Sequence, residues 1–132
     1  MLRKSVVSAI GLFLILVSCH SAHAQSSQWN FLGSATVDGA NDHDTIRVGK
    51  SSGYYRTIQL RVRGGTVVFQ RVVVRFANGT SQEIPVRYTI PSGGSTRAID
   101  LSGDKRYIQA LDLWYSKAHW ATRPKVSLYA AR

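Results

Sequence analysis

The stretch that decides the fold lies in the middle of the chain and reads RTIQLRVR, residues 56–63. Its apolar and polar residues alternate, so Ile58, Leu60 and Val62 fall on one side of an extended segment, and the residues between them fall on the other. A period of two is typical of a β-strand with one buried and one solvated face. We therefore predict a strand here, with an apolar inner face and a basic outer face.

The neighbouring segments extend this pattern. The run TVVFQRVVVRF, residues 66–76, is apolar for longer than simple alternation allows, which predicts a bulge or burial on both faces. In EIPVRYTI, residues 83–90, the alternation directs Ile84, Val86, Tyr88 and Ile90 inward. Pro85 falls on the outer side and cannot donate to a ladder hydrogen bond, which favours an edge position or a bulge.

No segment after residue 25 shows a sustained helical repeat, and Gly, Asn and Pro separate the β-branched runs. We predict an all-β fold, an antiparallel β-sandwich of the jelly-roll or immunoglobulin-like kind with about eight strands, formed by one domain over residues 25–132. The expected strands cover residues 29–37, 45–48, 56–63, 66–76, 82–90, 96–101, 107–115 and 125–129.

The N-terminus has the order of a secretory signal peptide. Arg3 and Lys4 precede an apolar run at 6–17, and Ala22-His23-Ala24 forms a small-x-small cleavage site. The run is too short to cross a bilayer core of about 30 Å as a helix. We predict that residues 1–24 are a signal peptide and that the protein is exported to the periplasm or the extracellular space.

Cys19 leaves an alternative for this processing. Residues 16–19, LVSC, also fit a bacterial lipobox, in which Cys19 would be acylated and would anchor the protein to a membrane. We favour cleavage after Ala24 because a full site is present there. Cys19 is the only cysteine, so a chain cut after Ala24 must be stabilised by burial without a disulfide.

The charge is strongly basic, with 17 Lys and Arg against 7 Asp and Glu. For an exported protein this balance favours an anionic envelope component, such as lipopolysaccharide, teichoic acid or an acidic glycan, or a protein partner, and nucleic acid is not expected. The alternative is that the charge only keeps the domain soluble, as in a structural or stress-related accessory protein without a specific ligand.

Arginines on three successive predicted strands form the first candidate site, since most of them could share one sheet face. Planar guanidinium groups suit carboxylate and phosphate, so a stripe of them would hold an acidic polymer. The alternative is a solvated outer face that is partly paired with Glu83. The candidate residues are Arg61, Arg63, Arg71, Arg75 and Arg87.

Two tryptophans in LWYSKAHWATRPK, residues 113–125, form the second candidate. Alternation directs Leu113 and Tyr115 inward and leaves Trp114 on the other side, and Trp120 falls in the loop that follows. An exposed Trp beside cations could stack on a sugar ring or contact a partner. The alternative is that Trp114 and Trp120 cap an open end of the core.

Acidic residues in VDGANDHDTIRVG, residues 37–49, form the third candidate, because Asp38, Asp42 and Asp44 could supply oxygen ligands to a hard cation. The segment lacks the glycine and the distal Glu of an EF-hand loop, and no set of zinc ligands accompanies it. We favour a turn braced by Asp42 and Asp44, before Ile46 enters the core. No metal or other cofactor is expected.

Catalytic patterns are weak. No Ser lies in a G-x-S-x-G elbow, Glu83 is the sole Glu, and no phosphate-binding Gly-rich loop precedes a helix. We expect a protein that is not an enzyme, with a hydrolase or metal-dependent enzyme as the less favoured alternative.

The pattern as a whole resembles a family of small exported proteins of unknown function carried by proteobacteria. The resemblance implies a bacterial envelope location and a β-sandwich fold, and it brings no assigned catalytic or binding residues. The motifs that carry it are W..LG at 29–33, D.DTI.V at 42–48, R.IQLRV at 56–62, V.VRF.NG at 72–79, TRAIDLSG..RYI at 96–108 and L.L.YS at 111–116.

Overall fold

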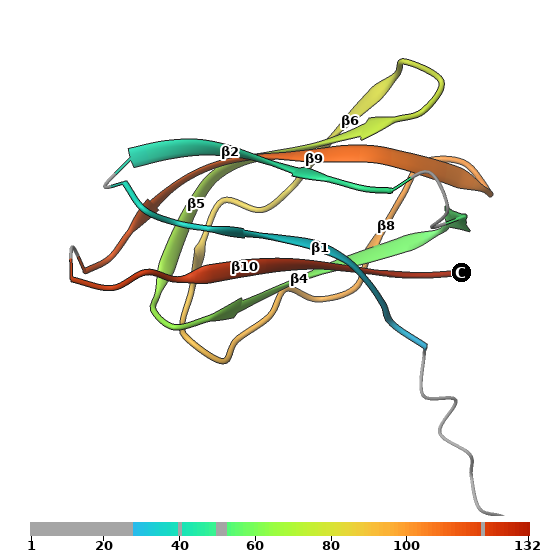
Figure 1. Ribbon diagram of the computed structural model, residues 1–132. Coiled ribbons are helices and arrows are strands. Elements are labelled where there is room, and N and C mark those ends of the chain that lie inside the picture. Colours follow the sequence, from blue (N-terminus) through green and yellow to red (C-terminus); the bar gives the residue numbers. More distant parts are fainter. Residues whose placement is uncertain (1–27, 40, 50–52, 120) are drawn as a thin grey trace, which may run out of the picture.

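The computed structural model describes residues 28–39, 41–49, 53–119 and 121–132. Within them the chain forms two antiparallel sheets packed face to face, which confirms the predicted all-β sandwich (Figure 1). The predicted signal peptide, Cys19 and Trp120 lie outside the described residues. Among the described residues we find no helix with the length and apolar character needed to cross a bilayer.

The four-stranded sheet has an order that departs from the order of the chain. Its last strand in sequence lies between the first strand and a strand from the middle of the chain, and all pairings are antiparallel. The alternation predicted for residues 56–63 is confirmed, since Ile58, Leu60 and Val62 are completely buried. In spatial order the strands are β1 (Asn30–Thr36), β10 (Lys125–Ala131), β4 (Thr57–Arg63) and β8 (Ile99–Asp100).

The six-stranded sheet packs against the apolar face of the four-stranded sheet. Its main path is β2 (Asn41–Arg47), β9 (Arg106–Lys117), β5 (Val67–Phe76) and β6 (Ser81–Ile84), and the short strands β3 (Tyr54–Tyr55) and β7 (Thr89–Ile90) pair with β9 and β5. The register of β5 against β9 shifts between Phe69 and Arg71, which confirms the bulge predicted in this run. Beyond the bulge Val72 and Val74 are fully buried, while Arg71 and Arg75 keep exposed surface.

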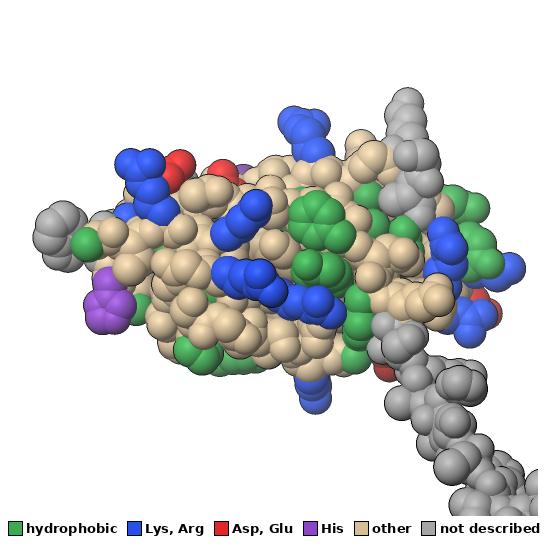
Figure 2. Space-filling model, turned by 60° about the horizontal axis from the view of Figure 1, so that its bottom comes forward, with side chains coloured by type: hydrophobic (Ala, Val, Ile, Leu, Met, Phe, Trp, Pro, Cys, Tyr) green, Lys and Arg blue, Asp and Glu red, His purple; other side chains and the backbone are tan. Residues whose placement is uncertain are grey.

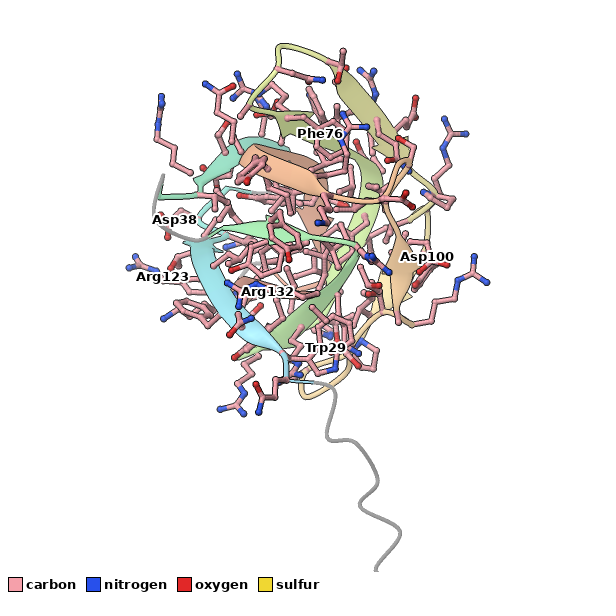
Figure 3. All side chains as sticks on the ribbon, turned by 90° about the vertical axis from the view of Figure 1, so that its right-hand side faces the viewer. Trp29, Asp38, Phe76, Asp100, Arg123 and Arg132 are labelled. Atoms are coloured by element: carbon pink, nitrogen blue, oxygen red, sulfur yellow. The ribbon has the colours of Figure 1, made fainter. Side chains whose placement is uncertain are left out.

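The core lies between the two sheets and is built from the inward residues of both. In the end-on view of Figure 3, Phe76 marks the upper, six-stranded side and Trp29 the lower, four-stranded side of the molecule. Burial of these side chains is the main favourable term in folding, because each contributes about 1.5–3 kcal/mol on leaving water. The largest fully buried ones are Tyr115, Phe69, Phe76, Ile46, Ile58, Leu60, Ile84, Ile90, Leu111, Leu113, Leu128 and Val37.

The predicted turn over the acidic cluster is wrong. Residues 41–47 form β2, which pairs with β9 along its whole length, so Asp42 and Asp44 belong to a strand and the chain turns before Asn41. β2 lies at the end of the sheet order, and polar or charged residues are common on such edge strands because they discourage pairing with other chains. The Asn and Asp residues of this edge strand therefore have the composition of a turn, although the segment is a strand.

Two other predicted strands are shorter than expected. The segment 82–90 breaks after Ile84, where Pro85 lacks the N–H that a ladder needs, and Tyr88 is 43% exposed instead of inward. The segment 96–101 retains only the two residues of β8. Thr96 is nevertheless buried, and its hydroxyl accepts a hydrogen bond from the backbone N–H of Leu60 at 3.0 Å.

Candidate polyanion-binding face

The topology divides the predicted arginine stripe between two opposite surfaces. Arg61 and Arg63 lie on β4 in the four-stranded sheet, whereas Arg71 and Arg75 lie on β5 in the six-stranded sheet. Arg87 is exposed between β6 and β7. The expectation that most of them share one face is wrong, because the Gly64–Gly65 connection carries the chain from one sheet to the other.

The outer face of the six-stranded sheet carries cations that are matched by acids. Asp112 is only 9% exposed. Its Oδ2 lies 2.9 Å from Nε of Arg75, and its Oδ1 accepts a hydrogen bond from Thr45 Oγ1 at 2.6 Å. Arg71 Nε lies 3.7 Å from Glu83 Oε1. We call these residues the paired cluster, and its acids offset the charge that a ligand would otherwise meet.

Trp114 belongs to the same outer face and does not cap an end of the core. Its ring stacks on His43, with the centroids 4.4 Å apart and the planes 10° from parallel. The guanidinium carbon of Arg71 lies 4.9 Å from the centroid of the Trp114 ring. Leu113 and Tyr115 are fully buried on the other side of β9, so the predicted phase of this strand is confirmed.

The outer face of the four-stranded sheet has a different charge pattern. It carries Arg61, Arg63 and Lys125, and none of the three forms an ion pair with any described acid. Strands β1, β10 and β4 contain no Asp or Glu, and Asp100 on the fourth strand, β8, lies opposite Thr57, at the other end of β4 from Arg63. Figure 2 looks obliquely onto this side, where Lys and Arg side chains gather at the centre beside hydrophobic ones and acids appear only toward the rim.

Aromatic side chains accompany these cations. The Phe31 ring meets the Tyr129 ring edge-on, with the centroids 5.6 Å apart, and Phe31 is 56% exposed. Trp29 lies just before β1 and lines a depression with Arg61 and Arg63. We call this surface the basic face and define it as Arg61, Arg63 and Lys125 with Trp29, Phe31 and Tyr129.

Contacts within the sheet hold Arg61 in place. Its guanidinium carbon lies 3.8 Å from the centroid of the Tyr129 ring, and its Nε donates a hydrogen bond to Gln59 Oε1 at 2.9 Å. Gln59 in turn donates from Nε2 to the backbone oxygen of Thr96 at 3.0 Å. Because its stem and head are already ordered, Arg61 loses little side-chain entropy when it meets an anion.

Two depressions lie side by side on the basic face. One has a volume of about 370 Å³ and is lined by Trp29, Gln59, Arg61, Arg63 and the segment around Gly93–Ser95. The other has a volume of about 350 Å³ and is lined by Phe31, Arg63, Lys125, Ser127 and Tyr129. Arg63 borders both. Volumes in this range suit a small ring-shaped ligand or one unit of a polymer.

Comparison with known proteins places the chain in a family. The model of a family described as Domain of unknown function (DUF2541) matches residues 9–130. The chain belongs to this family. The predicted relation to a family of unknown function is therefore confirmed, while its bacterial origin and its export remain predictions.

One solved structure resembles this DUF2541 member. It is described as "Structural and functional characterization of Pseudomonas aeruginosa AlgX", and the TM-score is 0.50 at 10% sequence identity. The likeness covers 78% of this chain and 27% of that one, so this chain spans about a quarter of the length of its structural neighbour. At this identity the likeness shows a shared fold alone. No curated protein matches the sequence.

The three candidate metal ligands of the DUF2541 domain have separate surroundings. Asp38 is exposed after β1, and its backbone oxygen accepts a hydrogen bond from Lys117 Nζ at 3.2 Å. Asp44 accepts a hydrogen bond from the hydroxyl of Tyr115. The side chain of Asp42 is outside the described set. Within that set no group of three or more His, Cys, Asp and Glu residues is placed to hold a metal ion.

Sequence reasoning missed four residues of the basic face: Trp29, Phe31, Lys125 and Tyr129. Part of the signal was available, because Lys125, Ser127 and Tyr129 alternate with Val126, Leu128 and Ala130 in the last strand. The neighbours of that strand were not available, because β10 pairs with β1 and β4, which lie far away in the chain.

Proposed function

We propose that this protein is a non-enzymatic binding domain of the bacterial cell envelope, and that it holds an anionic polymer on its basic face. One observation carries the proposal: three cations share this face, and the three strands beneath them contain no acid. A polymer bearing carboxylate or phosphate would supply the missing counter-charges, with several ion pairs acting together.

The chemistry of the face favours binding over catalysis. Its cations are Arg and Lys, which are charged at neutral pH, and its other functional groups are amide, hydroxyl and aromatic. The described residues that line the two depressions include no His, Asp or Glu, the side chains that most often transfer protons in enzymes. This composition suits a surface that holds a ligand unchanged.

The proposed location rests on the sequence. Arg3, Lys4 and the apolar run at 6–17 precede the Ala22–Ala24 site, as in an exported protein. The envelope polymers that such a domain would meet are lipopolysaccharide, teichoic acid and acidic glycans. We propose a soluble protein, with a membrane anchor only if Cys19 is acylated.

The proposal is tested with two variants that lose the same number of positive charges at different places on the surface. Replacing Arg61, Arg63 and Lys125 by Gln removes the three cations of the basic face, and replacing Arg47, Arg71 and Arg87 by Gln removes three cations elsewhere. The measurement is the salt concentration that elutes each protein from a heparin column, because exposed ion pairs weaken as salt rises. We expect the first variant to elute well before wild type and the second to elute close to it.

Two outcomes would contradict the proposal. Equal losses in both variants would show that total charge, and not the basic face, sets the interaction. Failure of wild type to bind heparin, lipopolysaccharide or a teichoic acid even at low salt would instead favour an accessory protein without a specific ligand.

A further inference from the structure

We infer that the polymer is an acidic polysaccharide and that two neighbouring sugar units occupy the two depressions of the basic face, with Arg63 between them. This inference rests on the proposed function and adds the chemical class of the ligand. It begins from the fact that each depression combines an aromatic wall with a cation of its own and shares a second cation with its neighbour.

The two depressions repeat the same set of groups. The first contains Trp29 and Arg61, and the second contains Phe31 and Lys125. Arg63 lines both. A repeated site with a shared central cation fits a ligand that itself repeats, because each unit then presents the same type of group to the same type of partner. A single small anion would need only one half of this arrangement.

The aromatic rings separate a sugar from other polyanions. A pyranose ring presents a flat array of C–H groups that packs against an aromatic plane, whereas a phosphate chain has no apolar face. Phe31 has more than half of its surface exposed, although a large apolar side chain is usually buried. Its position beside Lys125 and Tyr129 gives that exposed ring a neighbouring cation, as a charged sugar requires.

The cations indicate the acidic part of the ligand. Arg63 on β4 and Lys125 on β10 are directly opposite each other in the antiparallel register, on the same outer face. Directly opposed like charges destabilise a sheet, and in this pair no described acid relieves the repulsion. A carboxylate placed between them would relieve it. The planar guanidinium of Arg63 can also bind a carboxylate in a two-pronged manner.

The paired cluster does not offer an equivalent site. There Asp112 already accepts from Thr45 and pairs with Arg75, and Glu83 pairs with Arg71. Its Trp114 ring is stacked on His43 and lies beside the Arg71 guanidinium, so the ring has partners within the protein. The two faces thus differ in two ways: the cations of the basic face form no ion pair with a described acid, and its Phe31 ring is more than half exposed. Both differences favour the basic face.

The test compares three probes by calorimetric titration. The protein is expressed from the whole sequence and purified in the form that the cell produces. The probes are an oligogalacturonate, the same oligosaccharide with its carboxylates reduced to alcohols, and a polyphosphate of matched charge. We expect the oligogalacturonate to bind about tenfold or more tightly than either of the others, since only it combines ring stacking with ion pairing.

Variants then separate the two contributions. Phe31→Ala should weaken oligogalacturonate binding by about three- to tenfold and leave polyphosphate binding unchanged, because it removes the ring and no charge. Phe31→Trp keeps an aromatic plane and should retain binding. Tyr88→Ala, which removes an exposed ring elsewhere, should have no effect. Arg63→Gln should weaken the binding of both oligogalacturonate and polyphosphate. Melting curves would show that each variant is folded.

Failure of the inference can be told apart from failure of the proposed function. Polyphosphate that binds as tightly as oligogalacturonate, together with no effect of Phe31→Ala, would overturn the polysaccharide and leave a general polyanion-binding face. Absence of binding to both polyanions at low salt would overturn the proposed function as well. Equal binding of the neutral and the acidic oligosaccharide would overturn the role assigned to Arg63 and Lys125.

Discussion

Arg63 and Lys125 are cross-strand neighbours of like charge, paired across β4 and β10 at one end of the four-stranded sheet. In most sheets such a position holds an opposite charge or a neutral side chain, because opposed cations repel each other. We therefore expect this pair to lower stability locally, and an anion that neutralises the two cations to remove the repulsion.

Lys125→Gln is expected to stabilise the protein while it weakens polyanion binding. Removal of one opposed cation should raise the free energy of unfolding by about 0.2–1 kcal/mol, measured by urea denaturation at low salt. Arg47→Gln removes a charge from an exposed position on β2 and should change neither quantity appreciably. A Lys125→Gln protein that is less stable than wild type would show that the lysine contributes to packing instead.

Tyr129 is expected to affect ligand binding through Arg61, whose guanidinium lies over its ring. Tyr129→Leu should lower the affinity for polyanions by about two- to fivefold, because a cation–π contact between half-buried surface residues contributes about 0.5–1 kcal/mol to holding the arginine. Tyr129→Phe keeps the ring and should bind like wild type. Equal losses in both variants, measured by titration, would assign the effect to the hydroxyl.

Asp112 is expected to contribute more to stability than Glu83. Asp112→Ala removes the partner of Arg75 and of the Thr45 hydroxyl, and should lower the free energy of unfolding by about 1–3 kcal/mol, with allowance for the partly exposed arginine. Glu83→Ala breaks only an exposed pair and should cost about 0–1 kcal/mol. Chemical denaturation compares the two, and a larger loss from Glu83→Ala would contradict this ranking.

Gly33 is expected to tolerate no side chain. A Cβ at this position would lie 2.7 Å from Cγ2 of Ile46, which is buried where β1 approaches β2. Gly33→Ala should therefore lower the free energy of unfolding by about 1–3 kcal/mol, as overpacking usually does. Gly49→Ala is the matched control, because a Cβ there meets no atom within 4 Å. Thermal melting compares the two variants, and equal melting temperatures would contradict the prediction.

Local patterns in the sequence predicted the parts of the fold that depend on local physics. The inward phase of Ile58, Leu60 and Val62 follows from alternation alone, and the bulge in β5 follows from an apolar run that alternation cannot accommodate. The first half of β2, residues 41–44, was missed because its Asn and Asp residues have the composition of a turn, whereas the strand predicted from residue 45 onward is present. Pairing with β9, which supplies partners for His43 and Thr45, outweighs that local preference.

The candidate site was only half predictable, because it depends on which sheet each strand joins. Arg61 and Arg63 were identified from their phase on one strand, but nothing local showed that β5 would leave their sheet and take Arg71 and Arg75 to the other side. Nor did anything local show that Lys125 would arrive beside Arg63. Strand order is decided by the packing of the whole chain, so the residues of a sheet face cannot be collected by reading along it.

The central place of β10 in its sheet also sets the order in which the protein can fold. β1 and β4 do not pair with each other. Both pair with β10, which lies between them, so these pairings form only when β10 is in place. Pairings between such distant segments are slow, typically on the millisecond-to-second scale for β-sandwiches. A nascent chain that still lacks residues 125–131 thus leaves the edges of β1 and β4 that pair with β10 without a partner. The basic face is complete only after β10 has joined the sheet.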